Sequence, residues 1–94
     1  MGELFDRIVA AVGERRYLIG LHAANRLDDR GIPDWQVVAG LPDGKLLRER
    51  SHDRPNPAIE VEQLLPDGTP VKAVWSWLPR QRVAKLVTVH YFDR

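Results

Sequence analysis

The sequence predicts an α+β domain in which N-terminal helices pack on one face of a four-stranded antiparallel sheet. Up to about residue 41, apolar residues recur at helical spacing. After Gly44 they alternate with polar residues, which is typical of strands with one buried face. Turn sequences rich in proline, aspartate and glycine separate the alternating runs. Helices followed by strands favour an antiparallel sheet over a parallel one.

Two helices are expected in the first 30 residues. The first runs from about residue 2 to residue 13 and carries apolar residues one, three and four apart: Leu4, Phe5, Ile8, Val9 and Val12. Tyr17 to Ile19 is expected to be a short apolar linker. The second helix spans Leu21 to Arg30, because Gly31 suits the position after a helix end and Pro33 prevents continuation.

A third helix and four strands complete the expected fold. Asp34 is a suitable N-cap for a helix from Trp35 to Leu41. The expected strands are Lys45 to His52, Ala58 to Leu65, Val71 to Leu78 and Val83 to Phe92. The segment Pro66 to Pro70, which contains Asp67-Gly68, predicts a hairpin between the second and third strands.

Alternation divides the strands into two faces. The expected core face holds Ile59, Val61, Leu65, Val71, Ala73, Trp75, Trp77, Val83, Val87, Val89 and Tyr91. The opposite face holds Arg48, Arg50, His52, Glu60, Glu62, Lys72, Ser76, Thr88 and His90. This polar face carries several titratable groups, and its two glutamates are expected to pair with neighbouring cations. A solvated face with cross-strand ion pairs is also ordinary for an antiparallel sheet.

Composition limits the classes of protein. The 94 residues predict one domain, 1–94, and 44% hydrophobic with 29% charged residues is typical of a globular chain. The absence of cysteine excludes disulfides, thiolate nucleophiles and cysteine-ligated zinc. No apolar run approaches the roughly 20 residues that span a bilayer. The N-terminal segment lacks a signal-peptide pattern, so a cytoplasmic location is expected.

The basic residues are mostly arginine, although the formal net charge is only +1. Lys45, Lys72 and Lys85 are the lysines among 14 basic residues. Arginine presents a planar, permanently charged fork that suits carboxylates and phosphates. The same preference can also follow from a GC-rich genome.

His22, Arg26 and Arg30 lie four residues apart, on one flank of the second helix. A histidine can transfer protons near neutral pH, and an arginine can stabilise the charge of a phosphorane. In the structural alternative, His22 bonds a backbone carbonyl and the arginines pair with Asp29 or Glu49.

His90 lies near the end of the last strand, on the polar face, and is a candidate general acid or base. His52 begins a polar loop and is a weaker candidate. The three histidines are 30 and 38 residues apart, which matches no local metal-ligand spacing, so no metal is expected.

Motifs along most of the chain resemble a known family. They are Tyr17-Leu18-Ile19-Gly20-Leu21-His22-Ala23, Arg26-Leu27, Arg30-Gly31-Ile32-Pro33, Val37, Asp53-Arg54-Pro55, Asp67-Gly68 with Val71, and Val87-Thr88-Val89-His90-Tyr91. In this order, over about residues 17 to 92, they resemble a bacterial family known as domain of unknown function 4258. That family often has a serine at the position of Gly20, so a side-chain cap is not expected there.

Members of that family are similar, in the order of helices and strands, to small toxins of the RelE/ParE and MqsR type. The resemblance therefore implies a RelE-like toxin fold and a type II toxin–antitoxin pair. It implies a metal-independent endoribonuclease, without cofactor, that is neutralised by a cognate antitoxin of the zinc-finger, helix-turn-helix type. In such a reaction the RNA 2′-hydroxyl attacks the adjacent phosphate, which needs a base, a cation and an acid.

The candidate site residues are His22 and His90 for proton transfer, Arg26 with Arg48 or Arg50 for the phosphate, and Lys72 as a supporting cation. His22 and His90 can share a site only if the second helix passes over an edge of the sheet. Two alternatives remain: a non-catalytic protein-binding module, including an inactive toxin relative, and a single-strand nucleic-acid binder that does not cleave.

Overall fold

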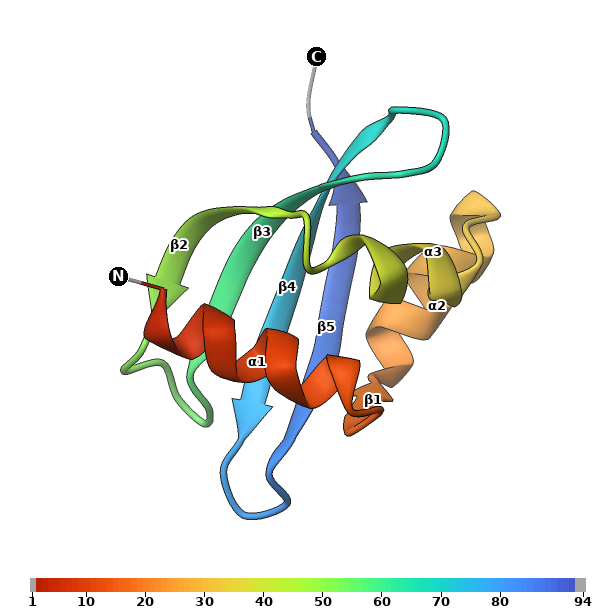
Figure 1. The fold of residues 1–94 in the computed structure, drawn as a ribbon. Coiled ribbons are helices and arrows are strands. Elements are labelled where there is room, and N and C mark those ends of the chain that lie inside the picture. The colour runs from red at the N-terminus through yellow and green to blue at the C-terminus, as the bar shows by residue number, and fades with distance from the viewer. Residues whose placement is uncertain (1, 93–94) are drawn as a thin grey trace.

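The computed structural model describes residues 2–92 as three helices and one sheet (Figure 1). In chain order the elements are α1 (Glu3–Gly13), β1 (Tyr17–Ile19), α2 (Leu21–Arg30), α3 (Asp34–Gly40), β2 (Lys45–Arg50), β3 (Ala58–Leu64), β4 (Pro70–Leu78) and β5 (Val83–Tyr91). The strands are ordered β1-β5-β4-β3-β2. Helix α1 crosses one face of the sheet, and α2 and α3 lie toward the β5 side (Figure 1). The α+β class is confirmed.

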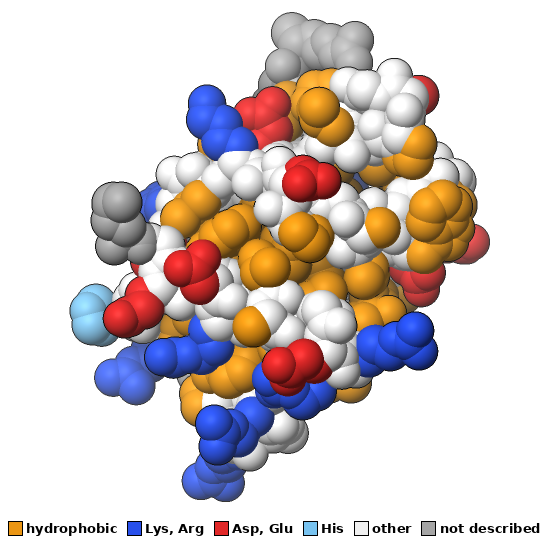
Figure 2. All heavy atoms as spheres, in the orientation of Figure 1, with side chains coloured by type: hydrophobic (Ala, Val, Ile, Leu, Met, Phe, Trp, Pro, Cys, Tyr) orange, Lys and Arg blue, Asp and Glu red, His pale blue; other side chains and the backbone are white. Residues whose placement is uncertain are grey.

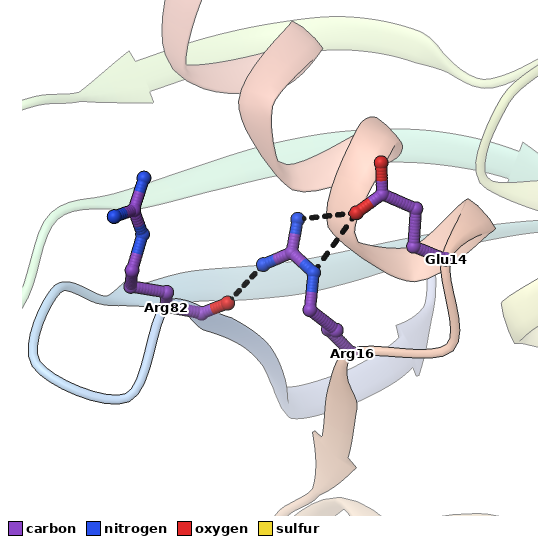
Figure 3. A network of polar contacts seen from close by, with 3 residues as sticks. All are labelled: Glu14, Arg16 and Arg82. Carbon is purple, nitrogen blue, oxygen red and sulfur yellow. Dashed lines mark hydrogen bonds and ion pairs between the residues drawn. The ribbon is translucent and has the colours of Figure 1, made fainter.

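The prediction of a four-stranded antiparallel sheet is wrong, because the sheet has five strands and is mixed. The segment Tyr17–Ile19, expected to be a linker, is β1 and pairs in parallel with β5. The turn before β1 fixes this pairing. The carbonyl of Arg16 accepts a hydrogen bond from the amide of Ala84 at 3.1 Å. The guanidinium of Arg16 donates to the Glu14 carboxylate and to the carbonyl of Arg82 (Figure 3).

The helices and one sheet face enclose the apolar core. The expected core residues of β3 and β4 are buried, including Ile59, Val61 and Trp75. Apolar side chains from all three helices complete this core. Figure 2 shows the helix-covered side, where apolar side chains lie among the helices and basic side chains gather toward the lower edge.

The predicted core face of β5 is wrong for half of the strand. Val83 and Val87 are only half-buried, whereas Ala84 and Leu86 are fully buried. The cause is a β-bulge. Thr88 is opposite Val74 and Leu86 is opposite Trp75, so Val87 has no partner and the alternation changes phase. Val89 is buried as predicted, and Tyr91 packs partly against the core.

Gln63 is a buried polar residue that the sequence pattern did not reveal. It is 1% exposed, and its amide nitrogen donates to the carbonyl of Val37 at 2.7 Å. Its amide oxygen accepts from the indole nitrogen of Trp75 at 3.1 Å. The Gln63 amide therefore gives a hydrogen-bond partner to a backbone carbonyl of α3 and to the indole of Trp75, the largest fully buried side chain.

Most predicted boundaries lie within one residue of the observed ones, and the start of α3 and the end of β2 change the role of a residue. Helix α2 has the predicted limits, and Gly31 follows it with φ 65°. Asp34 is not the N-cap of α3: it is the first helical residue, and Pro33 occupies the cap position. Strand β2 ends at Arg50, so His52 lies in the following turn rather than in a strand. None of the described helices is long and apolar enough to cross a membrane.

Candidate functional site

The sheet face away from the helices, called the open face, carries a line of charged side chains. Glu60 on β3 lies between two cations: Arg50 Nη1 is 3.6 Å from its Oε2, and Lys72 Nζ is 3.6 Å from its Oε1. Lys72 is directly opposite His90 in the β4–β5 pairing. The expected pairing with neighbouring cations is confirmed for Glu60, whereas Glu62 forms no ion pair within residues 2–92. The ion pairs of Glu60 connect β2 to β4 across the open face, and the pairing of Lys72 with His90 brings β5 beside them.

Helix α2 reaches the open-face residues because it starts against β5. The amide of Gly20 donates to the carbonyl of Leu86 at 2.9 Å, and α2 packs along β5. Strand β1 pairs with β5 only as far as Leu86. Beyond that residue the edge of β5 is free of β1, which leaves room for side chains of α2 beside the end of the strand. Helix α2 therefore approaches the edge of the sheet, which is the condition for its side chains to share a site with His90.

His90 is surrounded by positive charge. Burial, and then the cations of Lys72, Arg26 and Arg30, lower the pKa of the imidazole below its ordinary value of 6.5, while Glu60 opposes the shift. The imidazole is therefore mostly neutral at pH 7 and can accept a proton. Its Nε2 is buried and has no hydrogen-bond partner among residues 2–92. We call His90, Lys72, Arg26 and Arg30 the His90 cluster.

Two further polar atoms near this cluster are buried without a hydrogen-bond partner in the described residues. They are Nε of Arg26 and Oγ1 of Thr88, which lies two residues before His90 on the same face. Buried polar atoms are nearly always hydrogen-bonded, and each exception needs an explanation. A donor and a hydroxyl beside a neutral imidazole can together bind an anion that also accepts hydrogen bonds.

Tyr91 separates two shallow cavities beside the cluster. One of about 260 Å³ is lined by Arg26, Asp29, Arg30 and Tyr91, and one of about 200 Å³ by Lys72, His90, Tyr91 and Phe92. The guanidinium of Arg30 lies 4.9 Å from the centre of the Tyr91 ring, a cation–π contact. This contact holds Arg30 against Tyr91, the residue that lines both cavities.

The ion pairs that the structural alternative predicts for Arg26 and Arg30 are not observed. Within residues 2–92, neither Arg26 nor Arg30 forms an ion pair with Asp29 or Glu49. The Glu49 carboxylate instead accepts a hydrogen bond from the amide of Phe5 at 2.9 Å. Both guanidinium groups are therefore available to an anion.

The structure brings some of the predicted site residues together and leaves others apart. His90, Arg26 and Lys72 share one cluster, and Arg50 is linked to it through Glu60. Arg48 is exposed on the edge strand β2, opposite Glu60. His22 is exposed in the first turn of α2 and lines neither of the two cavities.

The candidate site residues did not include Arg30, Thr88 or Tyr91. The helical spacing places Arg30 on the flank of Arg26, and alternation places Thr88 on the face of His90, but neither pattern shows that α2 lies beside β5. No local pattern indicates that Tyr91 meets Arg30. Within residues 2–92, no three histidine or acidic side chains are grouped so as to hold a metal ion.

The fold and site define a small α+β domain whose open sheet face carries a cationic cluster around one histidine. Residues 19–91 match the family model described as domain of unknown function (DUF4258), and the chain belongs to that family. The family resemblance drawn from the motifs is thereby confirmed. No curated protein and no solved structure matches the chain.

Proposed function

We propose that this protein is a metal-independent endoribonuclease, the toxin of a type II toxin–antitoxin pair, and that the His90 cluster is its active site. The observation that supports this most is a histidine that stays neutral beside three cations. Cleavage of RNA by its own 2′-hydroxyl needs both a base and positive charge near the phosphate. The cluster offers both within one region of the open face.

The proposed reaction assigns a role to each group. The imidazole of His90 accepts the proton of the 2′-hydroxyl, and the 2′-oxygen attacks the adjacent phosphorus. Arg26, Arg30 and Lys72 stabilise the negative charge that develops on the phosphorane oxygens. The 5′-oxygen leaves and takes a proton from water, which reaches this exposed face. The products are a 2′,3′-cyclic phosphate and a free 5′-hydroxyl.

The proposed partner is a cognate antitoxin of the zinc-finger, helix-turn-helix type. It rests on the expected resemblance of the family to small toxins, not on a contact in this chain. A binding module without activity would need no partner to restrain it. Expression of the chain alone should therefore arrest growth, and co-expression of an antitoxin encoded beside it should relieve the arrest.

The nuclease is tested with purified protein, labelled RNA and a metal chelator throughout. His90→Gln should lower the cleavage rate by about 10²–10⁴-fold, the usual contribution of a general base. His52→Gln is the matched control, because His52 is exposed in a turn outside the cluster. His22→Gln tests the second histidine, and its expected rate is close to wild type, because His22 lines neither cavity.

Three results would contradict the proposal. RNA that stays intact indicates a binding module or a non-cleaving RNA binder. Cleavage that appears only after the chelator is replaced by a divalent metal salt requires a metal. Equal rates for His90→Gln and His52→Gln remove His90 as the base.

A further inference from the structure

A third cavity, here called the loop pocket, lies on the open face beside the His90 cluster. It measures about 250 Å³ and lies between the loop after β2 and the strands β3, β4 and β5. Binding sites for drug-sized ligands span roughly 300–1,000 Å³, so this pocket suits one ring system rather than a large molecule.

The chemistry of the loop pocket has two parts. Apolar side chains of Ala58, Val74 and Val87 form its strand side, and Val87 stands at the β5 bulge. Cationic side chains of Arg54 and Lys85 stand at its margin. A flat apolar ring beside negative charge therefore fits the pocket better than a purely apolar or purely ionic ligand.

Hydrogen-bonding groups complete the pocket. Asn56 has an amide that can donate and accept, Ser76 has a hydroxyl, and Asp53 has a carboxylate that accepts. Arg50 Nε lies 3.1 Å from Asp53 Oδ2. Because of this ion pair, the Asp53 carboxylate carries less uncompensated charge and repels an anion at the margin less. A heteroaromatic ring with N–H groups on its edge matches these groups.

The loop pocket adjoins the His90 cluster. Lys72, Val74 and Ser76 are successive open-face positions of β4, and the first belongs to the cluster while the other two line the pocket. Val87 and His90 are three residues apart on β5, or about 10 Å along a strand. The ion pairs Arg50–Glu60–Lys72 join the two regions. A phosphate at the cluster and a neighbouring base in the pocket are therefore compatible.

We infer that the loop pocket is a nucleotide subsite that holds the base next to the scissile phosphate, an inference that rests on the proposed nuclease function. The apolar strand side receives the base, Ser76 and Asn56 bond its edge, and Arg54 with Lys85 contacts a flanking phosphate. The substrate class is single-stranded RNA, because a base paired in a duplex is not free to enter a pocket.

Binding is measured with the four 2′-deoxyribonucleoside 5′-monophosphates, which cannot undergo attack by a 2′-hydroxyl. Amide shifts in two-dimensional NMR spectra should concentrate at Val74, Ser76 and Val87. Ribose 5-phosphate, which lacks a base, should leave these three amides unchanged. Shifts of the same size with ribose 5-phosphate would overturn the inference, because the base would then contribute nothing.

Two variants test the pocket, and one serves as control. Val87→Phe should fill the apolar side and weaken nucleotide binding about tenfold or more. Arg54→Gln, at an exposed position, should weaken it by about threefold. Arg80→Gln removes the same charge from the exposed β4–β5 turn and should leave binding unchanged. Equal affinity of Arg54→Gln and Arg80→Gln, with no effect of Val87→Phe, would overturn the subsite.

The outcomes separate the subsite from the nuclease. Nucleotide shifts in the pocket without RNA cleavage support the subsite and contradict the proposed function. RNA cleavage without nucleotide shifts supports the proposed function and contradicts the subsite. Shifts caused by a short glutamate peptide, and not by nucleotides, would overturn the subsite and assign the pocket to an acidic protein segment.

Discussion

Replacing Gly20 by alanine is expected to destabilise the fold, although its backbone suits any residue. Its φ of −64° and ψ of 154° are ordinary, so the cause is space rather than conformation. A Cβ built at Gly20 would lie 2.9 Å from the carbonyl oxygen of Leu86 and 2.9 Å from Cε of Lys85. The lysine side chain can move aside. The carbonyl cannot, because it accepts the hydrogen bond of the Gly20 amide at 2.9 Å.

The expected loss is about 1–3 kcal/mol in the free energy of unfolding, the usual cost of overpacking. Serine should not rescue it, because an N-cap serine improves on glycine by only a few tenths of a kcal/mol. Gly13→Ala is the matched control: Gly13 ends α1, and a Cβ there meets nothing within 4 Å. That variant should gain about 0.5–1 kcal/mol.

Urea denaturation followed by tryptophan fluorescence measures both variants, since Trp75 and Trp77 are buried. With a slope of about 1–3 kcal/mol per molar urea, the midpoint of Gly20→Ala should fall by roughly 1 M. The same contact places α2 beside β5, so this variant should also bring the pKa of His90 closer to its ordinary value. A Gly20→Ser protein as stable as wild type would refute the steric reasoning.

Two further changes test the core and the cluster. Gln63→Leu should cost roughly 1–3 kcal/mol for each unsatisfied group, because it leaves a carbonyl of α3 and the indole of Trp75 without a partner; unchanged urea stability would contradict this. In an NMR titration His90 should have a pKa below 6.5, and Lys72→Met should raise it. Because the pKa of His90 is lower in the folded chain, the unfolded chain binds more protons between that pKa and 6.5. The free energy of unfolding should therefore fall as the pH drops from 6.5 toward the folded pKa. His90→Gln should flatten this pH dependence.

Features that depend on local chemistry were predictable from the sequence. The hairpin at Pro66–Pro70 has Gly68 at φ 88°, and Asp67 accepts a hydrogen bond from the amide of Thr69 at 2.9 Å. Gly31 ends α2 in the left-handed region, as its position after the helical pattern predicts. Each of these requires only neighbouring residues, so a single sequence contains the whole signal.

Strand β1 was not predictable in the same way. Three residues are too few to show an alternation, and Tyr17 pairs with Ala84, which is far away in the chain. The pairing depends on Arg16, whose carbonyl and guanidinium both contact the end of the β4–β5 turn. In both contacts the partner of Arg16 is a backbone group, which every residue has, so the sequence does not identify that partner.

The position of His90 depends on the bulge at Val87. Ala84 and Leu86 face the core, so strict alternation from them would turn Thr88 and His90 toward the core as well. The additional residue reverses the phase, buries Val89 and leaves His90 opposite Lys72 on the open face. The predicted core face followed the alternation at the end of the strand, where Val89 is buried. It therefore placed His90 correctly on the open face, and it placed Val83 and Val87 incorrectly in the core. The bulge therefore sets His90 on the face where Val87 already lines the loop pocket, which is consistent with one substrate that contacts both.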